Sequence, residues 1–388
     1  MKYNFDEIID RDNTASVKFD LREKIFGKDD VMPVWVADMD FKTPDFIIDA
    51  LKKRLEHPIL GYSFRPDAYY QSIINWVKRR HSWEIDKDWI SFSPGIVPAI
   101  NMAIMAYTQP GDKIIVQPPV YHPFFSAIKN NERTQVENPL VLKNGRYHIN
   151  FEDLKTKLKD AKMILLSNPH NPGGSVWTKD ELRQLGKMCV ENDVLIMADE
   201  IHADLVFKPH KFIPVASISP EIEKNTVTFI APSKTFNIAG LATSSVIASN
   251  IELKEKYDAV LDTIHIGMGN IFGTIASEAA YNHGDEWLGQ LLEYLSQNIE
   301  FVGDYISKNI PEIKMIKPEG TYLIWLDCSA LNLNGKDLKD FMINDASLGM
   351  NDGRMFGTGG DQFMRMNIAC PRKIIEKALN NLEKAVNQ

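Results

Sequence analysis

The middle of the chain alternates short apolar runs with amphipathic segments, and this alternation is the strongest constraint on its fold. The apolar runs fall at 112–121, 161–174, 194–202, 225–234 and 243–250. Between two of them, 177–193 has helical spacing, with Thr178 as N-cap and Glu181 completing a capping box. Strands separated by helices predict an α/β fold with a mostly parallel sheet and crossover helices.

After about residue 285 the pattern changes. A long amphipathic helix is expected over 286–310, and a strand, a helix and a strand are expected at 320–329, 334–347 and 361–370. A chain of 388 residues is too long for one simple core. We therefore predict a large domain over 46–285 and a smaller α+β domain built from 1–45 and 286–388.

Charge and composition exclude several classes of function. The formal net charge of −8 repels phosphate backbones, and no basic block offsets it, so we expect no nucleic-acid partner. No apolar stretch approaches the roughly 20 residues needed to span a bilayer. The charged start "MKYNFDEIIDRDNT" lacks the apolar core of a signal peptide, which predicts a cytoplasmic protein. The three scattered cysteines and nine histidines form no metal-binding motif, so we predict no metal.

Polar side chains follow the ends of the expected strands, where open α/β sheets bind ligands. Asp199 follows "VLIMA", Asn171 lies in the stiff turn "NPHNPGG", and Lys234 follows "TVTFIAP". A buried carboxylate needs a cation or a proton donor, and a buried lysine has a lowered pKa that frees its lone pair. Gly95 precedes a helix expected to begin near Ile96, whose free N–H groups suit a phosphate.

An amine, a carboxylate, a rigid amide and a phosphate cradle on one sheet edge match the needs of pyridoxal 5′-phosphate (PLP). Lys234 can form the Schiff base with its aldehyde, and Asp199 can keep the ring nitrogen protonated. Asn171 can donate to the 3′-oxygen, and Tyr121 in "VYHPFF" offers an aromatic face to the ring.

The ordered series "SPG", "YHPF", "NPHNPGG", "ADEIH" and "SKTFN" resembles the fold-type I PLP-dependent enzymes. "VWVADMDF", "GYSFRPDAYYQSI" and "RMNIACPR" extend the resemblance to the cystathionine β-lyase (C–S lyase) group of the class-II aminotransferase-like enzymes. The resemblance covers nearly the whole chain. It implies a large domain with a seven-stranded sheet, and the roles given above for Asp199, Asn171 and Tyr121. Lys234 would also serve as general base and acid.

The resemblance implies further contacts. Gly95 and Ile96 would give backbone N–H groups to the phosphate, with Ser233 as a further contact. Tyr62 in "GYSF" resembles a tyrosine that reaches the phosphate of the neighbouring subunit, which implies a homodimer. Arg365 would bind the substrate α-carboxylate, for which a guanidinium fork is suited.

Two departures from related aminotransferases favour a lyase. Those enzymes usually carry a phosphate-binding arginine eight residues after the lysine, where this chain has Ala242. Many also have a tyrosine three residues after the aspartate, where this chain has His202, as the β-lyase group tends to have. His202 is therefore a candidate ring contact, although a buried structural histidine is an equally good interpretation.

We predict β-elimination from cystathionine- or cysteine-type thioethers to pyruvate, ammonia and a thiol. The alternative is an aminotransferase acting between amino acids and 2-oxo acids. A protein that uses the fold only to bind a metabolite or a regulator is a third hypothesis. Taken singly, Asp199 suits a helix cap, Tyr62 and Tyr121 suit core or interface aromatics, and Arg365 suits a structural ion pair.

Overall fold

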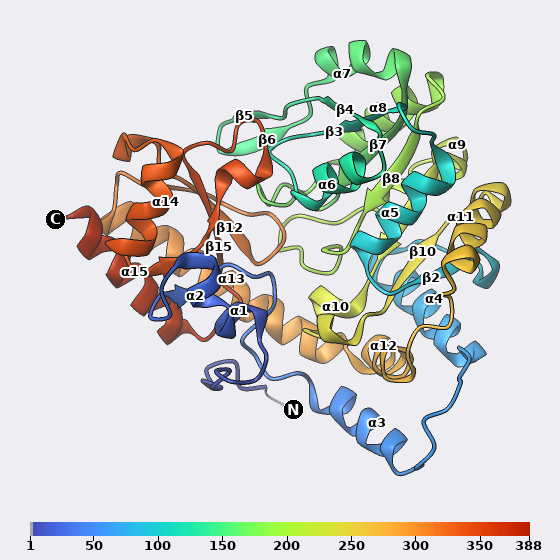
Figure 1. Ribbon diagram of the computed structural model, residues 1–388, viewed down its shortest axis with the longest axis horizontal. Helices are drawn as coiled ribbons and strands as arrows, with labels where there is room; N and C mark the ends of the chain where they lie inside the picture. Colours follow the sequence, from blue (N-terminus) through green and yellow to red (C-terminus); the bar gives the residue numbers. More distant parts are fainter. Residues whose placement is uncertain (1–2) are drawn as a thin grey trace.

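A computed structural model describes residues 3–388, and its centre is a seven-stranded sheet (Figure 1). In spatial order the strands are β2 (Ile90–Ser93), β10 (Ser244–Ile247), β9 (Thr226–Ile230), β8 (Leu195–Asp199), β7 (Ala161–Ser167), β3 (Lys113–Val116) and β4 (Thr134–Glu137). The strands from β9 to β4 pair in parallel, and β10 is antiparallel to both of its neighbours. The predicted mostly parallel α/β sheet is confirmed.

Alternate residues of the central strands point to two separate hydrophobic layers. On β7, Met163 and Leu165 join the layer under α5 (Ile96–Tyr107), α6 (Pro123–Asn130) and α11 (Ile251–Ile264). Ile164 and Leu166 join the opposite layer under α7 (Phe151–Lys157), α8 (Lys179–Glu191) and α9 (Pro220–Lys224). A strand covered on both faces must be apolar at every position, which explains the continuous apolar runs.

The C-terminal part forms a second, four-stranded antiparallel sheet. Its spatial order is β11 (Lys314–Ile316), β12 (Leu323–Asp327), β15 (Phe363–Asn367) and β14 (Asn351–Asp352). The long helix α13 (Asp285–Asn309) runs from beneath the central sheet to this second sheet (Figure 1). The N-terminal β1 (Met32–Pro33) pairs in parallel with β13 (Leu348–Gly349), so the two ends of the chain are joined.

The remaining elements are helices and one hairpin. They are α1 (Val17–Asp20), α2 (Arg22–Phe26), α3 (Asp45–Leu55), α4 (Asp67–His81), α10 (Pro232–Thr235), α12 (Ile271–His283), α14 (Gly335–Asn344), α15 (Arg372–Val386), β5 (Val141–Lys143) and β6 (Arg146–His148), with short 3₁₀ turns between them. Across residues 3–388, none of the helices combines the length and the apolar character that a bilayer span needs.

Most of the expected elements occur within a few residues of their predicted limits, including the capping box of Thr178 and Glu181. One boundary differs. The predicted strand 225–234 ends at Ile230, and Lys234 lies in the short helix α10. Pro232 explains the difference, because it has no N–H for the strand ladder and suits the first turn of a helix.

Two glycines five residues apart, Gly284 and Gly289, predict opposite effects of alanine substitution on stability. A Cβ at Gly284, between α12 and α13, would overlap the ring of Phe236 and the carbonyl of Ala280, whereas one at exposed Gly289 meets open space. We expect Gly284→Ala to lower the free energy of unfolding by about 1–3 kcal/mol. Gly289→Ala should raise it by about 0.5–1 kcal/mol, because glycine is unfavourable inside a helix. Urea titration of both variants measures this, and equal effects would contradict the packing described.

Candidate active site

A cavity of about 210 Å³ lies at the carboxyl ends of the parallel strands. Its lining combines eight of the predicted site residues: Gly95, Ile96, Tyr121, Asn171, Asp199, His202, Ser233 and Lys234. β8 ends at Asp199, and β9 ends four residues before Lys234. Because β8 and β9 are neighbours in the sheet, the carboxylate and the amine reach the same cavity from adjacent strands.

The amine of Lys234 points into the cavity and donates a hydrogen bond of 2.6 Å to the carbonyl of Ala37. Burial and the nearby Arg365 guanidinium together lower the pKa of this amine to about 8, against the opposing effect of Asp38 and Asp199. About one-tenth of Lys234 is therefore neutral at pH 7, far more than for an ordinary lysine. Such an amine can act as a nucleophile or as a base.

Asp199 is buried, and its carboxylate accepts one backbone hydrogen bond, from Ile201 N–H at 3.2 Å. Burial raises the pKa of this carboxyl to about 7. The turn formed with Ile201 fits the capping interpretation of Asp199, but one neutral donor leaves most of the acceptor capacity of the carboxylate unused. A protonated ring nitrogen in the cavity would use it.

Asn171 and Arg365 form a connected pair behind the cavity. Arg365 Nη1 donates to Asn171 Oδ1 at 3.0 Å, which leaves the amide Nδ2 of Asn171 available as a donor. Arg365 Nη2 donates to Asn351 Oδ1 at 2.6 Å and to the carbonyl of Trp35 at 3.2 Å. Arg365 is buried, with 5 % of the residue exposed, and its hydrogen bonds found within residues 3–388 go to amide and backbone oxygens rather than to a carboxylate. Its Nε also lacks a partner, so Arg365 is a buried cation available to an anionic ligand.

Another part of the cavity lining comes from the N-terminus of α5 and from the segment after Lys234. Gly95 is the N-cap of α5, and Ser93 Oγ donates to its carbonyl at 2.7 Å, which fixes the turn. The first N–H groups of the helix, beginning at Ile96, have no partners within the helix. Ser233 and Thr243 add hydroxyls to this wall of the cavity. Ala242 lies here too, and the lining contains no arginine.

Two more predicted residues complete the lining. Tyr121 stacks on His122 with ring centroids 5.5 Å apart, and burial raises the pKa of its phenol. His202 is buried with no partner for Nδ1, and burial lowers the pKa of its imidazole to about 3. His202 is therefore neutral, and the nearby cations Lys234 and Arg365 also favour its neutral form.

Two of the ten predicted site residues are not part of the lining, Arg365 and Tyr62. Arg365 contacts the lining residue Asn171, whereas Tyr62 lies apart from the cavity. Its side chain is 98 % exposed, and that of Phe64 is 83 % exposed. Both belong to a segment without regular structure between α3 and α4. One chain alone does not bring Tyr62 into the site.

The chain matches the family model described as "Aminotransferase class I and II" over residues 29–382. It is 42% identical to cystathionine β-lyase PatB of Bacillus subtilis, over 99% of this chain and 100% of that protein. A structure of a PLP-bound putative aminotransferase from Clostridium difficile superposes with a TM-score of 0.98 at 49% identity, over 100% of both chains. Cystalysin of Treponema denticola, which contains PLP, gives a TM-score of 0.97 at 39% identity, over 100% of this chain and 99% of cystalysin.

The chain belongs to the aminotransferase class I and II family. The predicted resemblance to the fold-type I enzymes and their cystathionine β-lyase group is confirmed by these matches, and the fold class with it. PLP is the cofactor of the family and of the structures matched.

The residues of this family member fit PLP. Asp199 has unused acceptor capacity, and the start of α5 with its free N–H groups belongs to the lining of the same cavity. The amide of Asn171 is oriented by Arg365 with its donor free, and the amine of Lys234 lies in the same cavity. These groups would hold the ring nitrogen, the phosphate, the ring oxygen and the aldehyde carbon, respectively.

Reasoning from sequence missed the part played by the 34–41 loop, "VWVADMDF". Its Ala37 carbonyl holds the amine of Lys234 and accepts the hydroxyl of Tyr322 at 2.9 Å. A backbone carbonyl has no signature in the sequence. The available signal was the pair of acidic residues, Asp38 and Asp40, inside an otherwise apolar segment.

The buried carboxyl of Asp199 predicts a pH-dependent stability of the PLP-free protein. An unfolded aspartate has a pKa of about 3.9. Because the folded value is raised to about 7, ionisation of Asp199 destabilises the fold increasingly as pH rises from about 4 to about 7, and the penalty is constant above that. We expect Asp199→Asn to raise the free energy of unfolding, by about 2 kcal/mol more at pH 8 than at pH 5.

Urea titration of the PLP-free protein at the two pH values measures this difference. Asp160→Asn is the control, because Asp160 is largely exposed and should show no such dependence. Glu200, whose pKa is raised to about 8 by burial and also by the charge of Asp199, responds in the same direction. Asp199→Asn should lower the pKa of Glu200 in the folded state and so add to the gain at pH 8. A gain for Asp199→Asn that is the same at both pH values would contradict the prediction.

Proposed function

We propose that this protein is a PLP-dependent C–S β-lyase that cleaves cystathionine- or cysteine-type thioethers to pyruvate, ammonia and a thiol. The observation that carries the proposal is the shared cavity of Lys234 and Asp199, with the unpaired cation of Arg365 behind it. The names of PatB, a cystathionine β-lyase, and of the matched lyase structures support the same reaction. His202 and Ala242, where related aminotransferases carry tyrosine and arginine, agree with it.

The protein supplies the amine of Lys234 to carry a proton, the guanidinium of Arg365 to orient the substrate, and the cavity that both groups adjoin. When bound, the coenzyme supplies an electron sink for the bond that breaks at the substrate Cα. Lys234, with a pKa near 8, can remove the Cα proton and return a proton later. Asp199 would keep the ring nitrogen protonated, and Asn171 would donate to the ring oxygen. A thiolate then leaves Cβ readily, because a thiol with a pKa of about 8.5 forms a stable anion near neutral pH.

Arg365 would hold the α-carboxylate of the substrate. Its Nε is already free, and an incoming carboxylate can replace the weaker contact to the carbonyl of Trp35. Phe356 supports the guanidinium from one side, with the centroid of its ring 4.9 Å from Arg365 Cζ. A planar fork held on an aromatic face fixes the orientation of the substrate as well as its position.

An aminotransferase remains the second candidate, and one observation favours it. The structure that matches with 49% identity is described as a putative aminotransferase. Both reactions need the same proton removal by Lys234, and they differ in whether a group leaves Cβ before the coenzyme carbon is protonated. A product assay therefore separates them directly.

Incubation with cystathionine should release pyruvate and free thiol in equal amounts, without any 2-oxo acid being added. Coupled measurement of pyruvate by lactate dehydrogenase and of thiol by a disulfide reagent follows both products. Lys234→Ala should lose at least about 1,000-fold in rate, since the proton carrier is removed. Amino transfer to an added 2-oxo acid, without pyruvate from cystathionine, would identify an aminotransferase instead.

We also propose that the chain works as a cytoplasmic homodimer in which Tyr62 reaches the phosphate of the partner subunit. The division into a large domain over 46–285 and a small domain from 1–45 and 286–388 stays a prediction. The segment that carries Tyr62 supports the dimer, because four of its apolar side chains are more than half exposed. They are Ile59, Leu60, Tyr62 and Phe64.

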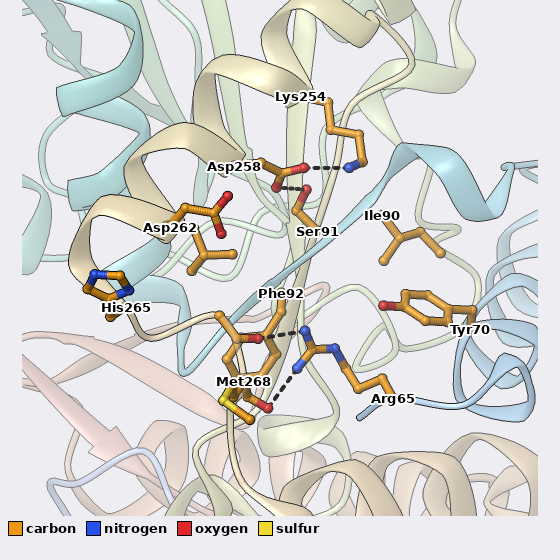
Figure 2. Close-up of a pocket in the computed structure, with 12 residues that line it drawn as sticks. Arg65, Tyr70, Ile90, Ser91, Phe92, Lys254, Asp258, Asp262, His265 and Met268 are labelled. Atoms are coloured by element: carbon orange, nitrogen blue, oxygen red, sulfur yellow. Dashed lines mark hydrogen bonds and ion pairs between the residues drawn. The ribbon is translucent and has the colours of Figure 1, made fainter. Parts of the chain in front are cut away.

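The base of this segment is held firmly, as Figure 2 shows around Arg65. The guanidinium of Arg65 donates to the carbonyls of Gly267 and Met268 at 2.6 and 3.0 Å, and it lies 4.5 Å from the ring centroid of Phe92. An open hollow of about 600 Å³ adjoins these contacts. A segment fixed at its base, with uncovered aromatic tips, suits an interface with a second copy.

Complementation between variants tests the shared site. Lys234→Ala lacks the amine, and Tyr62→Ala should weaken PLP binding roughly tenfold by loss of a phosphate contact. A hybrid dimer has one site with both defects and one site with neither. Lys234→Ala is inactive, and Tyr62→Ala is largely without PLP when the coenzyme is limiting. Mixing the two variants under that condition should therefore raise activity to about a quarter of the wild-type value. A monomer in sedimentation, or no recovery after proven subunit exchange, would contradict the proposal.

A further inference from the structure

The 34–41 loop places a charged residue beside the active-site amine. Ala37 accepts the hydrogen bond from Lys234 Nζ, and Asp38 is the next residue. The loop is held in place by two asparagines that follow site residues in sequence. Asn237 bonds the backbone of Met39 through both ends of its amide, and Asn367 donates to the carbonyl of Asp38 at 2.6 Å. The loop therefore has a fixed position relative to Lys234.

The carboxylate of Asp38 is paired with a cation from the N-terminal segment. Arg11 Nη2 lies 2.7 Å from Asp38 Oδ2, and Arg11 Nη1 lies 3.2 Å from Asp38 Oδ1. Arg11 also bonds Asp40, whose other oxygen receives the buried ammonium of Lys18 at 2.7 Å. The ammonium of Lys18 is 3.9 Å from Asp38, so the principal partner of Asp38 is Arg11. The charge of Asp40 is therefore neutralised by Lys18 as well as by Arg11, whereas the charge of Asp38 is neutralised mainly by Arg11.

The charges that face Lys234 come from several elements. Asp199 at the end of β8 and Asp38 on the loop both favour the protonated amine, and Arg365 on β15 opposes it together with burial. His202 is neutral. Asp38 also contributes to the raised pKa of Tyr322, whose hydroxyl shares the Ala37 carbonyl with Lys234. Asp38 thus acts on both donors to that carbonyl.

We propose that Asp38 and Arg11 form a charge pair that sets the protonation of the Lys234 amine through the 34–41 loop. Asp38 stabilises the ammonium form, and Arg11 weakens that effect by neutralising Asp38. Arg11 is therefore a positioning and tuning residue that acts through Asp38. The inference rests on the proposed function only in that Lys234 is the reacting amine. It assigns the N-terminal segment a part in the chemistry of the site.

Substitutions of Asp38 and of Arg11 should shift the pKa of Lys234 in opposite directions. Asp38→Asn removes a negative charge and leaves Arg11 unpaired, so Lys234 should lose its proton at lower pH. Arg11→Gln leaves Asp38 unneutralised, so Lys234 should keep its proton to higher pH. Both side chains are about one-fifth exposed, so solvent moderates the effect. We expect shifts of about one pH unit in each direction.

The rate at which PLP-free protein takes up added PLP reports the fraction of Lys234 that is unprotonated, because only the neutral amine attacks the aldehyde. The rate is followed by absorbance as a function of pH, and the titration of free PLP is common to all variants. The midpoint should fall for Asp38→Asn, rise for Arg11→Gln and lie between the two for the double variant. The acid limb of kcat for β-elimination, in which Lys234 acts as the base with substrate bound, should move in the same directions.

Arg22→Gln is the matched control. Arg22 belongs to the same N-terminal segment and pairs with a carboxylate, Asp12, but has no contact with the loop. Its midpoint should equal that of wild type. Arg11→Lys keeps the charge and should also stay near wild type, which separates the charge from the fit of the side chain. If Arg11→Gln does not fold, Arg11→Lys and Asp38→Asn still decide the result.

Shifts of the same sign in Asp38→Asn and Arg11→Gln, or no shift in Asp38→Asn, would overturn the inference. General loosening of the loop cannot produce opposite signs. Wild-type protein that takes up no PLP at any pH would instead overturn the proposed function. The two failures are therefore distinguishable in one experiment.

Discussion

The site depends on two ionisable groups of opposite charge that share one poorly hydrated cavity. Burial works against the charged form of each, lowering the pKa of Lys234 to about 8 and raising that of Asp199 to about 7. The free energy for this arrangement comes from the continuous apolar layers on both faces of the central sheet, which hold β8 and β9 side by side. Without those layers the groups would be hydrated and chemically ordinary.

The second sheet completes the site from the other side. Arg365 on β15 reaches Asn171 on the loop after β7, although the two residues are 194 positions apart. The N-terminal segment adds a third contribution, because the 34–41 loop carries the carbonyl that holds Lys234. The central sheet, the second sheet and the N-terminal segment must therefore all be folded before Lys234, Asp199 and Arg365 lie in the arrangement described.

The sequence allowed accurate prediction where a local pattern carries the information. The start of α5 at Ile96, the capping box of Thr178 and the strand leading to Asp199 all follow from short-range signals. The turn at Pro232 was missed because apolar character continues past the end of the strand. The contacts of Arg365 with Asn351, and of Ala37 with Lys234, join distant segments through single atoms, and no periodicity reports such contacts. The roles of the site residues, with that of Tyr62, stay predictions.

One amide links the two ligand positions of this cavity. The oxygen of Asn171 is bound by Arg365, and its nitrogen is the donor proposed for the ring oxygen of the coenzyme. An amino acid that draws Arg365 toward its carboxylate also changes the polarisation of that amide. Thermodynamic reciprocity then requires that occupation of either position alter the affinity of the other by the same factor. With the roles proposed for Arg365 and Asn171, amino acid and coenzyme would be mutual effectors, coupled through a single planar group.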